Sequence, residues 1–323
     1  MKKLVLSVSG GGALGIGPLH FMRKLEEDLG IKKEGLGSIC SAFAGTSTGS
    51  IIATGLRNGM TAKKLFDLYK KNLSSIFKAR NIRLFDSLSL KKINTKKFSL
   101  NDVALLLQEN YYRYDNSGLI KLLKENFPDR MNCNEKLLFI PTTYMNGESV
   151  EKVWDNKDTS VEQSFAVLTS CSAPTYFDTV KDRGREFCDG GMWANDPIMV
   201  LESGIKEFCK KSKYEKMFAD GFKILSFNTG MAHPNKGPDG KNIVSWLFYM
   251  VDEWIARTGE SNLFEARANI GAENIYRCCP KTDKTYAMDD LKVLDEVIEE
   301  WDKYYKSAGS FVCEFIESTM EKK

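Results

Sequence analysis

Short apolar runs alternate with segments of helical periodicity along the first 230 positions of the chain. The runs lie at residues 4–9, 39–44, 137–141 (continuing to 145) and 222–227. Apolar runs of this length, bounded by glycine or polar residues, are typical of buried strands rather than of buried helices. The pattern therefore predicts four strands in the interior of the protein.

Helical periodicity follows the first two of these strands. Residues 18–29 place four apolar side chains at helical spacing, and Gly30 follows where a helix should stop. Residues 50–56 are typical of a second helix. Alternating strands and helices predict a three-layer α/β/α fold, with a mainly parallel sheet and helices on both of its faces.

The rest of the chain favours one domain with helical additions. The predicted additions are a Lys/Arg-rich helical insertion at about 61–135, a Pro/Gly-rich loop at 231–241, and helices at 243–257 and 289–321. No linker, internal repeat or low-complexity tract interrupts the sequence. We therefore predict a catalytic core over residues 1–230 and a C-terminal helical extension over residues 231–323, packed on the same domain.

Composition narrows the class of protein. The formal net charge of the 323 residues is only +3, which does not indicate a polyanion-binding protein, and no nucleic-acid partner is predicted. Eight cysteines are scattered without a C-x-x-C pair and the histidines are His20 and His233, so no zinc site is predicted. Scattered thiols and the lack of a membrane-spanning apolar run favour the cytoplasm.

The sequence Gly45-x-Ser47-x-Gly49 lies between a predicted strand and a predicted helix. This is the context of a nucleophile elbow, in which a serine is exposed on a sharp strand-to-helix turn. Glycines allow the tight turn, and the helix N-terminus favours negative charge that develops beside the serine. An ordinary Gly/Ser turn is the alternative, and the context favours a nucleophile.

A glycine loop, Gly10-Gly11-Gly12-Ala13-Leu14-Gly15, follows the first strand. Consecutive glycines can present backbone N–H groups to an anion. The anion could be a nucleotide phosphate, but the acidic residue expected after the next strand is missing. The other candidate is the oxyanion of a tetrahedral intermediate, and the elbow serine makes it the better interpretation.

A nucleophilic serine needs a base, and neither histidine has a neighbouring carboxylate that indicates a triad. Asp189-Gly190-Gly191 places an aspartate on a tight turn. By itself this segment is more typical of a hairpin turn. A partly desolvated carboxylate can nevertheless act directly on a serine hydroxyl, which would form a Ser–Asp dyad.

Three motifs in this order resemble the signature of the patatin-like phospholipase family: Gly10-Gly11-Gly12-x-x-Gly15, Gly45-x-Ser47-x-Gly49 and Asp189-Gly190-Gly191. Residues 172–177 resemble the Ala-Pro segment that precedes the aspartate in the family, and Asn195 and Pro197 match the Asn-x-Pro that follows it. Residues 225–230 are similar to the strand ending in Thr-Gly. The resemblance covers about residues 2–230.

The resemblance implies a dyad of Ser47 and Asp189 that needs neither a metal nor a cofactor. Ser47 would attack an acyl ester, and Asp189 would take its proton and later activate water. Backbone N–H groups around Gly11, Gly12 and Ala13 would hold the oxyanion. The loop departs from the family at two positions: Ser9 replaces the usual acidic residue, and Leu14 replaces the usual Arg or Lys.

The implied activity is that of a phospholipase A-type lipid acyl hydrolase, which releases fatty acid and lysolipid through an acyl-enzyme. Acyl transfer to an alcohol acceptor is an alternative, as is a membrane-degrading effector switched on by an unidentified ligand. A catalytically inactive scaffold is a further alternative, and the intact Ser47 and Asp189 argue against it.

Two further segments bear on partners. Residues 61–100 hold eleven Lys or Arg against two Asp, with aromatic residues interleaved. They form either a basic surface for anionic lipid headgroups or a solvated helical cover whose aromatics pack on the sheet. The aromatic stretch at 243–255 is either core or the wall of a homodimer or substrate tunnel. We expect a phospholipid or another acyl-ester lipid as substrate and a reversible, peripheral membrane contact.

Overall fold

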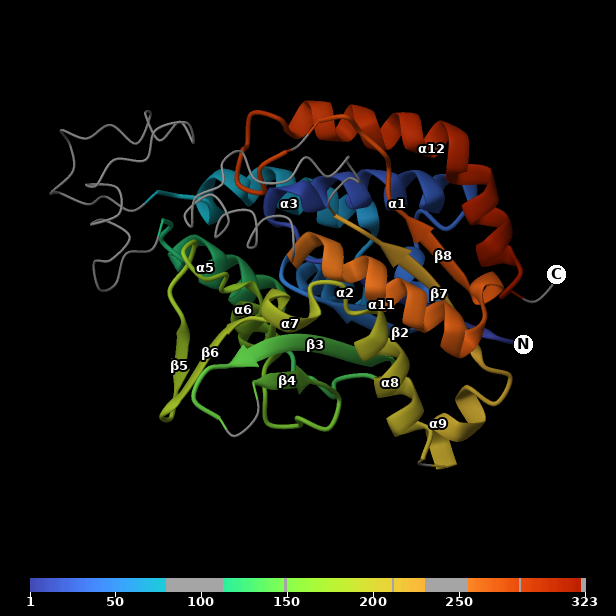
Figure 1. Cartoon of the computed structure of the whole chain (residues 1–323), viewed down its shortest axis with the longest axis horizontal. Helices are drawn as coiled ribbons and strands as arrows, with labels where there is room; N and C mark the ends of the chain where they lie inside the picture. The colour runs from blue at the N-terminus through green and yellow to red at the C-terminus, as the bar shows by residue number, and fades with distance from the viewer. Residues whose placement is uncertain (80–112, 148–149, 211, 230–254, 285, 321–323) are drawn as a thin grey trace, which may run out of the picture.

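A computed structural model describes residues 1–79, 113–147, 150–210, 212–229, 255–284 and 286–320 of the chain. Within these residues one eight-stranded sheet has the order β5-β6-β3-β2-β1-β7-β8, with β4 paired to β3 (Figure 1). The strands are β1 (Lys3–Val8), β2 (Cys40–Gly45), β3 (Leu137–Tyr144), β4 (Glu151–Trp154), β5 (Val180–Asp182), β6 (Arg185–Asp189), β7 (Phe222–Phe227) and β8 (Ile275–Cys278).

The centre of the sheet is parallel. β1 lies between β2 and β7, and β3 and β8 continue the parallel pairing outward on either side. β4 and β6 pair with β3 in antiparallel fashion, and β5 pairs with β6. The four predicted strands are confirmed as β1, β2, β3 and β7. The sequence pattern did not predict the short strands β4, β5, β6 and β8.

Helices cover both faces of the sheet. The α-helices are α1 (Ile16–Asp28), α2 (Thr48–Arg57), α3 (Ala62–Ile76), α5 (Ser117–Asn126), α6 (Gln163–Cys171), α7 (Gly191–Ala194), α8 (Ile198–Phe208), α9 (Ser212–Met217), α11 (Ile255–Ile270) and α12 (Leu294–Glu317), and the 3-10 helices are η1 (Gly12–Gly15), η2 (Leu36–Ser38) and η5 (Ala272–Asn274).

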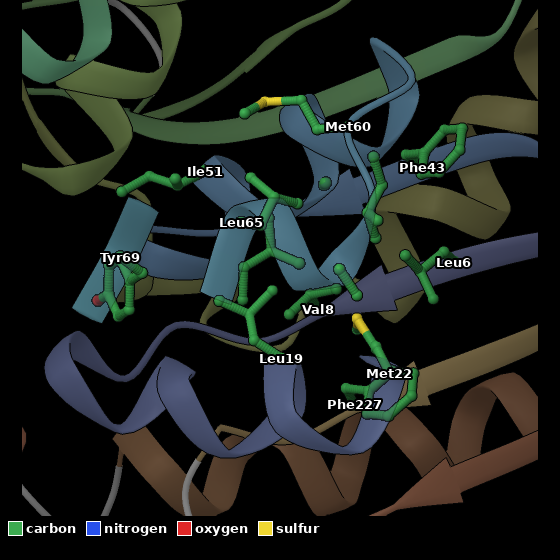
Figure 2. Close-up of a cluster of buried hydrophobic side chains, with 14 of the residues drawn as sticks. Leu6, Val8, Leu19, Met22, Phe43, Ile51, Met60, Leu65, Tyr69 and Phe227 are labelled. Carbon is green, nitrogen blue, oxygen red and sulfur yellow. The ribbon is translucent and has the colours of Figure 1, made fainter. Parts of the chain in front are cut away.

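Side chains that alternate along β1 separate two hydrophobic cores. Leu6 and Val8 belong to the larger core, which is covered by α1, α2, α3, α5, α6 and α12. Figure 2 shows Leu6 and Val8 gathered with Leu19 of α1 and Leu65 of α3. Val5 points to the opposite face, where α8 and α11 form the second core. A strand buried on both faces is typical of the middle layer of an α/β/α fold, and the predicted fold class is confirmed.

The predicted helices are confirmed where the chain is described. Residues 18–29 and 50–56 lie in α1 and α2, and the helix predicted at 289–321 is α12. The insertion at 61–135 contributes α3 and α5, and its residues 80–112 lie outside the described part. The loop at 231–241 and most of the aromatic stretch at 243–255 also lie outside it. No described helix has the length and apolar character that crossing a bilayer requires.

Candidate active site

The glycine loop and the serine turn leave the sheet side by side. β1 and β2 are parallel neighbours with Val8 opposite Gly45, so the segments that follow them emerge at the same edge. A Cβ added to Gly10 would lie 3.1 Å from the Cβ of Ser47. The structure thus brings together two motifs that are separated by more than thirty residues in the sequence.

Ser47 lies on a sharp turn between β2 and α2. Its backbone has φ 52° and ψ −126°, a conformation that non-glycine residues rarely adopt. The flanking glycines are required by close approach, because a Cβ on Gly45 would lie 2.1 Å from the Gly49 carbonyl oxygen. A Cβ on Gly49 would lie 2.1 Å from the Val8 carbonyl oxygen. This geometry matches the nucleophile elbow predicted from the sequence.

Asp189 reaches the serine through the antiparallel part of the sheet. β2 pairs with residues 137–139 of β3, whereas β6 pairs with residues 142–144, beyond the end of β2. Asp189, the last residue of β6, therefore lies close to the turn that follows β2. Its carboxyl group accepts a hydrogen bond from the Gly191 amide at 2.7 Å, and the nearby Ser47 side chain acts to lower its pKa.

The environment of Asp189 changes its acidity. The residue is 5 % exposed, and burial raises the pKa of its carboxyl group to about 7, although the Gly191 amide and the Ser47 side chain oppose the rise. Gly190 allows the close approach behind it, since a Cβ there would lie 2.2 Å from the Pro141 carbonyl oxygen. The carboxyl group therefore titrates near neutral pH beside a serine hydroxyl.

The predicted oxyanion residues differ in whether their backbone N–H groups are already hydrogen-bonded. Ala13 donates its backbone N–H to the carbonyl oxygen of Met288 at 2.7 Å. For the Gly11 and Gly12 amides, the described residues provide no hydrogen-bond partner. Leu14, which stands where the family has a cation, is buried in the larger core. Gly11 and Gly12 are thus the free donors of the loop within the described structure.

Two contacts around the site were not predicted from the sequence. The Ser170 hydroxyl accepts a hydrogen bond from the Ser47 amide at 3.0 Å and donates one to the Pro141 carbonyl at 2.6 Å. The Asn195 carbonyl accepts the Gly10 amide at 3.0 Å. Asn195 belongs to the Asn-x-Pro segment that resembles the family, so the sequence marks this residue although it does not show the contact. Ser170 belongs to no motif, so no sequence signal marks it.

His20 does not enter this arrangement. The His20 ring lies between α1 and α12, where it contacts Asp302 at 3.2 Å and Arg23 at 3.0 Å, and burial lowers its pKa. His233 lies outside the described residues. In the described ranges no three His, Cys, Asp or Glu side chains come together in a group that could hold a metal ion.

Comparisons with known proteins identify the family to which the chain belongs. The model of a family described as patatin-like phospholipase matches residues 6–202. A cGAMP-activated phospholipase of Vibrio cholerae is 27% identical over 210 residues, which are 61% of this chain and 56% of that protein. The chain therefore spans about half the length of that relative.

A second cGAMP-activated phospholipase, from Escherichia coli, is 27% identical over 304 residues, with 91% of this chain and 80% of that protein covered. Among solved structures, VipD from Legionella pneumophila aligns over 98% of this chain and 67% of its own length, with 14% identity and a TM-score of 0.41.

Proposed function

The chain belongs to the patatin-like phospholipase family, and from this premise we propose that it is a phospholipase A-type lipid acyl hydrolase acting through Ser47 and Asp189. The observation that carries the proposal is the position of the Ser47 side chain beside a buried carboxyl group whose pKa is raised to about 7. A base with a pKa near the working pH combines an adequate ionised fraction with a useful proton affinity.

In the proposed reaction, Asp189 accepts the Ser47 hydroxyl proton as the oxygen attacks the ester carbonyl carbon. The carbonyl oxygen becomes an oxyanion, which backbone N–H groups of the glycine loop stabilise. Asp189 returns the proton to the leaving alkoxide, which departs as lysolipid and leaves an acyl group on Ser47. Asp189 then takes a proton from water, whose hydroxide attacks the acyl-enzyme, and the proton returns to Ser47 as fatty acid leaves.

The contact between Ala13 and Met288 limits which amides can serve. The Ala13 N–H points to the Met288 carbonyl, so it can reach an oxyanion only after that hydrogen bond breaks. Gly11 and Gly12 can donate without such a change. The proposed oxyanion hole therefore consists of the Gly11 and Gly12 amides, with Ala13 as a third donor once residue 288 moves.

The proposed substrate is a phospholipid at a cytoplasmic membrane surface that the protein contacts reversibly. The two bacterial relatives are named for activation by cGAMP, which supports a cyclic dinucleotide as the activator. Acyl transfer by the same acyl-enzyme is the second candidate. Product analysis with water and a competing alcohol separates hydrolysis from transfer, because the acyl group appears either as free fatty acid or as a new ester.

The nucleophile and base are tested with a fluorophosphonate probe and a p-nitrophenyl ester. Ser47→Ala should lose both labelling and hydrolysis, and Asp189→Asn should lower turnover by about 10⁴-fold, as expected when a nucleophile loses its activating partner. Ser310→Ala, at an exposed position of α12, is the matched control and should behave like the wild type. Mass mapping of the label to a serine other than Ser47 would refute the assignment.

A further inference from the structure

A buried ion pair lies behind the candidate site. Arg277 Nη1 is 2.7 Å from Asp196 Oδ2, and the two side chains are 7 % and 2 % exposed. Asp196 lies between α7 and α8, seven residues after Asp189. Arg277 belongs to β8, beyond the residues that the family model matches. The pair thus joins the aspartate segment to a strand from the C-terminal part of the chain.

Several elements meet at this pair. Asp196 Oδ1 accepts the Ile198 amide at 3.2 Å at the start of α8, and the Asp196 carbonyl accepts the Asn262 side-chain amide of α11 at 3.0 Å. Arg277 Nη1 also donates to the Ser226 hydroxyl of β7 at 2.6 Å. Arg277 therefore links two strands of the sheet to the segment that follows the aspartate motif.

The two residues before Asp196 form hydrogen bonds with the serine turn and with the glycine loop. The Ala194 carbonyl accepts the Thr46 hydroxyl at 2.6 Å, directly before Ser47. The Asn195 carbonyl accepts the Gly10 amide at 3.0 Å, and Asn195 Oδ1 lies 2.5 Å from where a Cβ on Gly10 would stand. Residues 194 and 195 thus contact the serine turn and the glycine loop together, so a displacement of Asp196 would disturb both.

The two side chains interact as a close ion pair. Among the described residues, Asp196 Oδ2 and Arg277 Nε have no aligned hydrogen-bond partner. Burial raises the pKa of Asp196, and Arg277 opposes that rise. Buried ion pairs can often be replaced by apolar residues without loss of stability. Stability alone therefore does not explain this pair, whereas a role in orientation does.

We propose that Arg277 is a positioning residue of the candidate site. By holding Asp196, it fixes residues 194 and 195 against Gly10 and Thr46 and so sets the placement of the glycine loop relative to Ser47 and Asp189. Arg277 touches neither substrate nor reacting atoms. The catalytic readout of this inference rests on the proposed function, whereas its structural readout does not.

The catalytic test compares Arg277→Met, Arg277→Lys and the apolar double variant Arg277→Met/Asp196→Leu in the full chain. We expect Arg277→Met to lower kcat on a soluble ester by about 10- to 100-fold with little change in KM, the scale of loss caused by a small misplacement of catalytic groups. Arg277→Lys keeps the charge and should recover part of kcat. The double variant should recover the melting temperature of the wild type but not its kcat.

The structural test is amide hydrogen exchange at Gly10, whose N–H is bonded to Asn195. Arg277→Met should speed this exchange relative to amides in β3, whether or not the protein hydrolyses an ester. If the wild type lacks esterase activity but Gly10 responds, the proposed function fails and the positioning role stands. The positioning role is overturned if kcat of the double variant recovers together with its melting temperature, or if Gly10 exchange is unchanged in Arg277→Met and in the double variant.

Discussion

At the scale of single residues, the acidity of the Asp189 carboxyl group depends directly on its burial. Because it must be ionised to accept a proton from Ser47, hydrolysis should rise with pH through about 7 and level off above it. The measurement is kcat/KM of a soluble ester from about pH 5 to pH 9. A profile that is flat through neutral pH would exclude Asp189 as the base.

The same titration links folding stability to pH. The pKa of Asp189 in the folded protein, about 7, lies above the ordinary value of 3.8, so the folded state binds the proton more tightly than the unfolded state does. The resulting stabilisation is complete below the unfolded pKa and is lost as pH rises through about 7. Asp189→Asn removes this titration. As the pH rises from about 4 to about 7, the melting temperature of this variant should therefore increase relative to that of the wild type.

At the level of residues, the motifs predicted Ser47, Asp189 and the glycine loop, and the structure places them together. The engagement of Ala13 could not be predicted, because its partner is a main-chain carbonyl 275 positions away at Met288. Every residue has such a carbonyl, so no side-chain pattern marks it. Ser170 was missed for a related reason, since a single serine in a helix has no distinguishing neighbours.

The packing of α1 against α12 shows how one glycine fixes the distance between two helices. A Cβ on Gly17 would lie 2.1 Å from Trp301 Cδ1, and Trp301 is fully buried between the helices. Gly17→Ala should therefore overpack the interface and cost about 1–3 kcal/mol of unfolding free energy, measured by urea denaturation.

The control is a second substitution on the facing helix. Trp301 Nε1 has no hydrogen-bond partner among the described residues, so Trp301→Phe removes bulk without breaking a bond. The double variant Gly17→Ala/Trp301→Phe should be more stable than the sum of the two single changes predicts. Additive losses would mean that the two residues do not limit the helix separation.

At the level of elements, the longer apolar strands and the periodic helices were predictable, and the short strands were not. β1, β3 and β7 are rich in apolar residues because both of their faces are buried. β8 has only four residues, and the sequence Ile275-Tyr276-Arg277-Cys278 places a charged side chain in the middle of the strand. That charge is compensated by Asp196 from another element, and no pattern local to the strand indicates this.

For the molecule as a whole, the proposed phospholipid substrate requires a surface that can contact a membrane. The described basic residues of α3, which include Lys63 and Lys70, are exposed, whereas Phe66 and Tyr69 are buried in the core. These aromatics therefore pack inward as a helical cover would, which leaves the exposed lysines of α3 as the groups that it could present to an anionic surface. The lysines at 91, 92, 96 and 97 lie outside the described residues.

We expect anionic vesicles to be hydrolysed faster than neutral ones, since each basic residue near an anionic surface contributes about 1 kcal/mol. Added salt should narrow the difference, because charges are screened over about 8 Å at physiological ionic strength. Reversing the charges of Lys91, Lys92, Lys96 and Lys97 should narrow it too, with hydrolysis of a soluble ester as the control. Equal binding to both vesicle types at low salt would contradict an electrostatic contact.

The strand order also has a consequence for synthesis on the ribosome. β1 is an inner strand of the sheet and is synthesised long before its partner β7, which begins only at Phe222. At a synthesis rate of about 5–20 residues per second, the edge of β1 that pairs with β7 stays unpaired for on the order of 10–40 seconds. An apolar strand with an open edge invites pairing with other chains. The nascent chain should therefore depend on chaperones until β7 has emerged.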